Sequence, residues 1–137
     1  MNHRTILKSA AVVSALYGLI LVLAPNTLMS MYGSPAVEGS GMYFAMLSGA
    51  MLLGWALMNW AASNAPDIVE IHYVLLGNLA SLVLSFIVTL VRQLTHAGAP
   101  DSGWINVGIF LVFSALFGYL YKASPAGYRL HSRGRPA

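Results

Sequence analysis

One apolar segment of this 137-residue chain, at positions 68–93, contains side chains that could transfer a proton. The segment reads IVEIHYVLLGNLASLVLSFIVTLVRQ, and it holds an acid and an imidazole, Glu70 and His72, near its start. A carboxylate and an imidazole act together as general acid and base only if both reach the same reactant. Residues two positions apart point to different faces of a helix, so the spacing of this pair does not predict a catalytic site.

Further along the same segment, uncharged polar residues recur on one side of the expected helix. This polar stripe consists of Asn78, Ser81, Ser85 and Thr89. At 100° per residue, the stripe and Arg92 fall within an arc of about 80°, opposite a face of aliphatic and aromatic residues. An unpaired amide in hydrocarbon costs several kcal/mol, so the stripe must face other protein. We therefore expect a packing seam, which becomes a ligand-binding surface, with Glu70 and His72 at its mouth, if it encloses a cavity.

The remaining reactive side chains do not form a recognisable catalytic or metal-binding set. The histidines are scattered along the chain, at His3, His72, His96 and His131. None of them pairs with another at the spacing of metal ligands along a helix. The chain has no cysteine, which excludes disulfides, thiolate metal sites and thiol redox chemistry. No phosphate-binding loop or nucleophile motif is present, so we predict no catalytic residue, metal, cofactor or nucleic-acid partner.

The composition indicates which kind of element positions the polar stripe. Hydrophobic residues make up 58% of the chain and charged residues 8%, whereas a typical soluble domain is about 25% charged. Four apolar segments, at 5–24, 41–62, 68–94 and 103–122, each reach the roughly 20 residues that a bilayer-spanning helix needs. Because the connections are short, we predict an all-α integral membrane protein with four transmembrane helices in a compact antiparallel bundle. This domain would cover residues 1–124, with a short basic tail at 125–137.

Basic residues predict the orientation of these segments. Arg4 and Lys8 lie near the start of the chain. Four more basic residues lie at or beyond the end of the fourth segment, namely Lys122, Arg129, Arg133 and Arg135. Because basic residues favour the cytoplasmic side, we expect a multi-pass protein of the bacterial inner (cytoplasmic) membrane with both termini in the cytoplasm. Arg92 is the exception, since it falls at the outer end of the third segment, where its side chain can reach the headgroups.

Small residues recur at four-residue intervals in several segments. Such small-xxx-small patterns let the backbones of neighbouring membrane helices approach closely. The sequence SALYG at 14–18 is echoed by SALFG at 114–118. An inverted repeat, as in some transporters, would also produce this echo, but the rest of the two segments does not match. The residues predicted to pack helices together are Ser14, Gly18, Gly41, Ala45, Gly49, Gly54, Ser114 and Gly118.

Two stretches in the first half of the chain resemble known proteins. They are an AP..L..MYG ending to the first segment, at positions 24–33, and FAMLSGAMLLGWALM at positions 44–58. With this layout, the chain resembles small bacterial four-helix membrane proteins of unknown function near the DoxX-like group. The resemblance implies four membrane helices, and it brings no catalytic residue to this sequence.

Three functions fit these observations. The first is a small non-enzymatic membrane protein that packs as an accessory subunit of a larger complex or as a homo-oligomer, since small residues abound and no chemical site stands out. The second is a protein, with or without enzymatic activity, that binds a lipid or another lipophilic small molecule along the polar stripe. The third is a small oligomeric transporter, which the lack of a charge near the bilayer centre disfavours. The expected partners are the bilayer, other membrane subunits or further copies of the chain, and in the second case a lipophilic ligand.

Overall fold

The computed structural model describes residues 2–96 and 98–124 of the chain. Its elements, in chain order, are α1 (His3–Leu23), α2 (Pro25–Met31), α3 (Gly39–Ala62), the short 3-10 helix η1 (Ile68–Ile71), α4 (His72–Thr95) and α5 (Gly103–Ala123). This described part contains no strand, so the all-α prediction is confirmed. Four helical segments are long and apolar enough to cross a membrane, as predicted: His3–Leu23, Gly39–Ala62, Ile68–Thr95 and Gly103–Ala123. The predicted basic tail at 125–137 lies outside the described residues.

Local hydrogen bonds decide where the first helices begin and end. Asn2 caps α1, because its Oδ1 accepts from the backbone N–H of Arg4 at 3.2 Å. Pro25 has no N–H to continue α1 and instead starts α2 at its first position, which a proline favours. Asn26 then holds the connection to α3, because its side chain accepts from the Val37 N–H at 2.7 Å and donates to the Val37 carbonyl at 3.3 Å.

The third predicted segment, 68–94, does not form a single α-helix. Asp67 Oδ1 accepts from the backbone N–H of Val69 at 3.1 Å, which stabilises a 3-10 turn in η1 before α4 starts at His72. Glu70 is exposed on this turn, so it lies outside the α-helix that carries the polar stripe.

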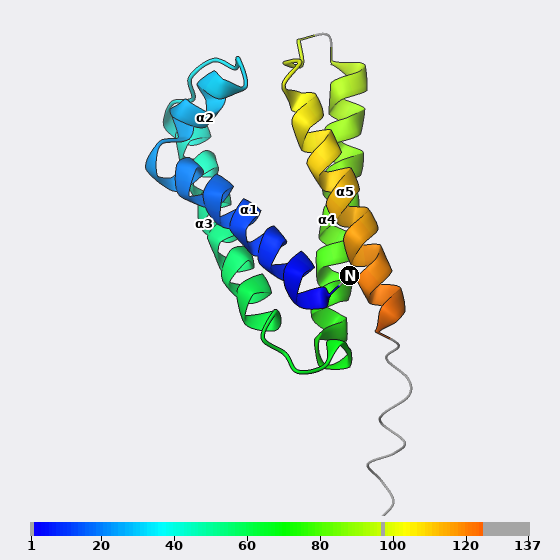
Figure 1. Cartoon of the computed structure of the whole chain (residues 1–137). Helices are drawn as coiled ribbons and strands as arrows, with labels where there is room; N and C mark the ends of the chain where they lie inside the picture. Colours follow the sequence, from blue (N-terminus) through cyan, green and yellow to red (C-terminus); the bar gives the residue numbers. More distant parts are fainter. Residues whose placement is uncertain (1, 97, 125–137) are drawn as a thin grey trace, which may run out of the picture.

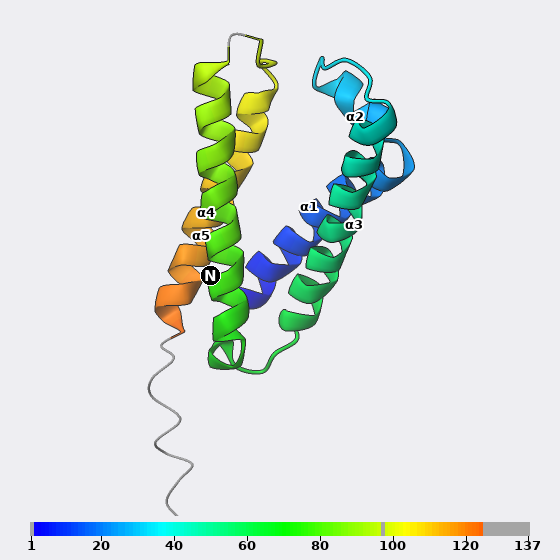
Figure 2. The same ribbon diagram turned by 180° about the vertical axis from the view of Figure 1, so that it is seen from behind.

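The long helices form two antiparallel pairs, α1 with α3 and α4 with α5 (Figure 1). Both views show that the pairs converge near η1 and separate toward α2 and the α4–α5 connection (Figures 1 and 2). We call these the closed end and the open end. The main hydrophobic core lies at the closed end and consists of Ile6, Leu7, Ala10, Ile71, Leu75, Leu82, Phe117 and Leu120. The four-helix arrangement is therefore splayed at the open end, where the prediction was a compact bundle.

Two of the predicted small residues bring α1 and α3 into backbone contact. A Cβ atom on Gly18 would lie 2.9 Å from the Gly49 carbonyl oxygen, and one on Gly49 would lie 2.8 Å from the Gly18 carbonyl oxygen. A Cβ on Gly118 would make an ordinary contact with Leu79 at 3.9 Å, and one on Gly54 would meet nothing within 4 Å. The other four residues predicted for packing are half-buried, namely Ser14, Gly41, Ala45 and Ser114.

Large apolar side chains cover the outer faces of the long helices. Leu57 on α3 is 72% exposed and Val88 on α4 is 66% exposed, and Leu16 on α1 and Leu111 on α5 are also exposed. Aqueous solvent disfavours so many exposed aliphatic groups, whereas lipid tails do not. The inner faces are thus the ones that can carry a polar site.

Candidate functional site

Two buried amides, one from α3 and one from α4, meet between the helix pairs. Asn59 and Asn78 are each 1% exposed. Trp55 Nε1 donates a short hydrogen bond to Asn78 Oδ1, and Asn59 Nδ2 donates to the same oxygen at 3.1 Å. Asn59 Nδ2 also donates to the Trp55 carbonyl at 3.0 Å, and Asn78 Nδ2 donates to the Val74 carbonyl at 2.8 Å. The expectation that Asn78 faces protein is confirmed.

The donor-only chemistry of the indole determines how both amides are oriented. Because Trp55 Nε1 can only donate, the Asn78 atom next to it must be the oxygen. The Asn59 atom that approaches this oxygen must then be the nitrogen. Asn59 Oδ1 is left buried without a hydrogen-bond partner among the described residues. A buried acceptor in this state is costly, and a water or ligand that donates a hydrogen bond would relieve the cost.

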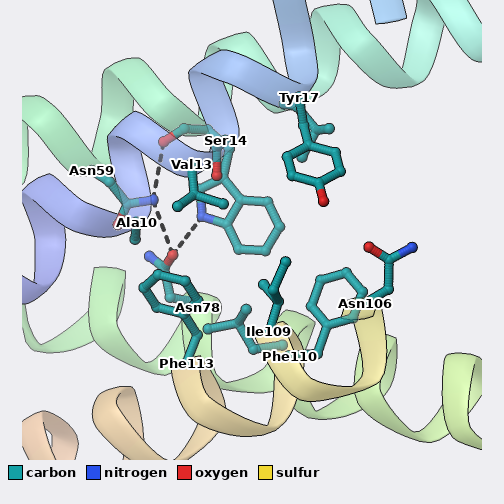
Figure 3. A pocket seen from close by; sticks show the side chains of 13 residues that line it. Ala10, Val13, Ser14, Tyr17, Asn59, Asn78, Asn106, Ile109, Phe110 and Phe113 are labelled. Atoms are coloured by element: carbon teal, nitrogen blue, oxygen red, sulfur yellow. Dashed lines mark hydrogen bonds between the residues drawn. The ribbon is translucent and has the colours of Figure 1, made fainter. Parts of the chain in front are cut away.

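A cavity of about 100 Å³ adjoins this amide cluster of Trp55, Asn59 and Asn78. Its walls are mainly apolar, and α1, α3, α4 and α5 all contribute to them. The remaining lining residues are Ala10, Val13, Ser14, Tyr17, Leu52, Leu82, Asn106, Ile109, Phe110 and Phe113. Figure 3 shows Asn59 and Asn78 at one end of the cavity and Tyr17 and Asn106 at the other. The cavity therefore runs between the two helix pairs, and the buried amides lie at the end of the cavity opposite Tyr17 and Asn106.

A chain of hydrogen bonds crosses between the helix pairs at the other end of the cavity. The Tyr17 and Tyr32 hydroxyls are 2.8 Å apart, and the Tyr32 hydroxyl donates to Asn106 Oδ1 at 2.8 Å. Because Tyr32 donates to Asn106, it accepts from Tyr17. Burial raises the pKa of Tyr32 above its usual value, the contact with Tyr17 raises it further, and the bond to Asn106 lowers it. The Tyr32 hydroxyl therefore stays protonated and keeps this link between the two pairs.

Beyond this link lies a larger cleft of about 560 Å³ at the open end. Tyr17, Asn106 and Phe110 line both spaces, so the cleft and the cavity adjoin. Arg92 and His96 also line the cleft. We call these two adjoining spaces the passage; Arg92 lines its outer part and the buried amide cluster lines its inner part.

The structure brings only two of the residues predicted to share one ligand-binding surface to the passage. Asn78 lines the cavity and Thr89 lines the open cleft. Ser81 is exposed and lines a shallow groove between α3 and α4, together with Gly54 and Gly77. The Thr89 hydroxyl donates to the carbonyl of the half-buried Ser85 at 2.8 Å, so it is satisfied within α4. A hydroxyl that bonds to its own helix does not need a partner helix, which is why the stripe does not act as one seam.

His72 lines neither space and belongs to a small cluster at the closed end. Its Nδ1 is 3.0 Å from the hydroxyl of Ser124, and its ring packs on Tyr121 with a centroid distance of 4.6 Å. The Ser124 hydroxyl also lies 3.1 Å from the Tyr121 carbonyl, to which it can donate. The tautomer of the imidazole determines whether His72 Nδ1 donates to Ser124 or accepts from it. Neither His72 nor Glu70 lines the cavity or the open cleft, so this pair does not lie at the mouth of the passage.

Several residues of the passage were not singled out from the sequence. Asn59 and Asn106 lie near the ends of their predicted segments, where an amide can contact headgroups, so neither one demanded a buried partner. The cost of an unpaired amide predicts that Asn78 needs a partner, but no single-helix pattern indicates that its partners are Trp55 and Asn59.

Comparison with known proteins gives one result. Neither the search of curated proteins nor the search of solved structures found a match. Nothing in these comparisons bears on the resemblance to the DoxX-like group, which stays a prediction. Residues 8–134 match the family described as a domain of unknown function, DUF8292, and the chain belongs to that family.

Proposed function

We propose that this protein resides in the bacterial inner membrane and holds an elongated lipophilic molecule between its two helix pairs. The observation that supports this proposal best is the passage itself, an apolar cavity of about 100 Å³ that adjoins an open cleft of about 560 Å³. Ligand sites are typically apolar hollows with a few polar groups, and they often lie between the helices of a bundle. The amide cluster and the Tyr32–Asn106 bond supply the polar groups in this case.

The basic residues give this proposal a direction. Arg4 and Lys8 lie at the closed end and favour the cytoplasmic side. In that orientation the open end faces the outer leaflet, so the ligand would enter from there. The exposed aliphatic side chains of the four long helices support a membrane location, because lipid tails would cover them.

A matched pair of substitutions on α1 tests whether the cavity holds a ligand. Val13 lines the cavity, whereas the neighbouring Val12 is 48% exposed on the outer face. Val13→Phe would therefore fill the cavity, and Val12→Phe would add the same ring to the lipid-facing surface. Native mass spectrometry of protein extracted from membranes in mild detergent would measure the bound lipid. We expect wild type and Val12→Phe to retain a lipid adduct and Val13→Phe to lose it. Equal adducts in all three, or no adduct on wild type, would contradict the proposal.

Self-association or packing in a larger complex is the second candidate function. It is supported by the groove between α3 and α4, where added Cβ atoms on Gly54 and Gly77 would meet nothing within 4 Å. Open glycine faces of this kind allow close approach of another membrane helix. The same mass measurement would report a dimer or a copurified subunit directly.

A further inference from the structure

The open cleft is lined by the cationic side chain of Arg92, which no acidic residue of the lining balances. None of the described lining residues is Asp or Glu. No ion pair involving Arg92 occurs among the described residues. From this lining we infer that the ligand of the passage is a single-chain lipid anion whose carboxylate or phosphate head binds Arg92. This inference rests on the proposed ligand-binding function and names its ligand class.

Two polar neighbours of Arg92 in the cleft, Thr89 and Gln93, already have partners within the chain. Gln93 Nε2 donates to the Pro100 carbonyl at 3.0 Å, and the Thr89 hydroxyl donates to the Ser85 carbonyl. The Arg92 side chain is exposed, and its guanidinium carries five donors in a planar fork. This fork matches the two oxygens of a carboxylate or phosphate, and such charge-assisted pairs are among the strongest hydrogen bonds in proteins. An anionic head is therefore the ligand group that complements the mouth of the passage.

The length and width of the passage indicate what the head is attached to. Arg92 and Asn78 are 14 residues apart on α4, which corresponds to about 21 Å along the helix axis. A chain that starts at Arg92 would pass the shared residues Tyr17 and Phe110 and end near Asn78. The inner cavity of about 100 Å³ is well below the roughly 300–1,000 Å³ of sites for drug-sized ligands. It has room for the end of one apolar chain, which favours a single-chain amphiphile.

Three amphiphiles with the same chain and different heads would test the inference. Delipidated protein in a neutral detergent would be mixed with equal amounts of hexadecanoate, hexadecyl phosphate and hexadecanol, and native mass spectrometry would compare their adducts. We expect at least one of the two anions to bind more tightly than the alcohol. The carboxylate and phosphate arms distinguish a fatty acid from a phosphorylated lipid. Arg92→Gln should remove the preference, a change of about ten- to a hundredfold for one lost charge-assisted contact.

Arg4→Gln is the control, because Arg4 is an exposed arginine at the closed end, outside both spaces. It should keep the preference of wild type for the anion. Equal binding of the alcohol and both anions to wild type would overturn the inference. An unchanged preference for the anion in Arg92→Gln would also overturn it. Arg92 would then interact only with the lipid headgroups around the protein. If the alcohol binds as tightly as both anions and Val13→Phe abolishes its binding, the proposed function stands and only the anionic head fails. If none of the three binds to wild type, both fail.

Discussion

Replacement of Asn78 by leucine should weaken the contact between α3 and α4 at the closed end of the cavity. Asn78 Oδ1 accepts hydrogen bonds from Trp55 Nε1 and Asn59 Nδ2. Leucine has a similar size and no acceptor, so Trp55 Nε1 would lose its partner in a buried setting. Asn59 Nδ2 would keep its second bond, to the Trp55 carbonyl at 3.0 Å. The substitution therefore removes two hydrogen bonds between helices and orphans one donor.

The size of the effect follows from that count. Hydrogen bonds between membrane helices average about 0.6 kcal/mol and reach about 1.7 kcal/mol. A buried donor left without an acceptor costs about 1–3 kcal/mol. Asn78 is 1% exposed, so water does not readily replace the lost acceptor. We expect Asn78→Leu to lower the free energy of unfolding by about 1–3 kcal/mol.

A double-mutant cycle separates the Trp55–Asn78 hydrogen bond from other effects of the substitution. Trp55→Phe removes the donor and keeps an aromatic ring. In that background Asn78→Leu no longer orphans the indole, so it should cost less, with a coupling energy of about 1 kcal/mol. Denaturant unfolding in detergent micelles would measure wild type, both single variants and the double variant. Val83→Leu, at a position of α4 that is 38% exposed, is the control and should change stability by less than about 0.5 kcal/mol.

Two results would refute this reasoning. If the effects of Trp55→Phe and Asn78→Leu add to within about 0.3–0.5 kcal/mol, the two side chains do not interact energetically. If Asn78→Leu is as stable as Val83→Leu, no partner of Asn78 contributes to folding.

Two further predictions concern the α1–α3 contact and the polar link at the inner edge of the open cleft. Gly49→Ala should destabilise the protein by about 1–3 kcal/mol, because its Cβ would lie 2.8 Å from the Gly18 carbonyl oxygen; Gly54→Ala, with open space at its Cβ, should be neutral or gain up to about 1 kcal/mol in the same unfolding assay. Tyr32→Phe should cost about 0.5–1.5 kcal/mol by breaking the bond to Asn106. Because the pKa of Tyr32 is raised in the folded protein, the contribution of its hydroxyl to the free energy of unfolding is fully present below pH ~10 and is lost as the pH rises further. Unfolding measured over a pH series should show that Tyr32→Phe lacks this loss of stability at alkaline pH. Equal stability of Gly49→Ala and Gly54→Ala, or the same pH profile for wild type and Tyr32→Phe, would count against these contacts.

Asn78 shows how far the sequence argument reaches. Its burial follows from the cost of an unpaired amide in hydrocarbon, which depends on one residue in one helix. Its partners Trp55 and Asn59 lie on α3, and their register against α4 depends on how side chains of two helices interlock. Hydrophobic periodicity describes one helix at a time, so it predicts that Asn78 needs a partner and does not identify the partner.

The positions of Glu70 and His72 show a second limit. Both were expected at the mouth of a pocket because they precede the polar stripe in the same apolar segment. The 3-10 turn of η1 sets Glu70 apart from α4, and His72 bonds to Ser124 at the closed end. The cleft opens at the opposite end of α4, beside Arg92. Which end of a four-helix protein stays open depends on the packing of all its helices, and hydropathy patterns do not report it.

Different kinds of interaction hold the two helix pairs together at the closed end and at the open end. This difference indicates where the pairs separate more easily. At the closed end the helix pairs share a hydrophobic core that includes Leu7, Leu75 and Phe117, each of them 0% exposed. At the open end the described polar contacts between the pairs are hydrogen bonds, from Tyr32 to Asn106 at 2.8 Å and from the Ser102 hydroxyl to the Tyr32 carbonyl at 2.9 Å. Each such bond contributes about 0.5–1.5 kcal/mol, whereas full burial of one large apolar side chain contributes about 1.5–3 kcal/mol. Separation of the pairs near α2 therefore costs less than separation near η1, and a chain-like ligand would enter past Tyr32 while the core at the closed end keeps the two pairs together.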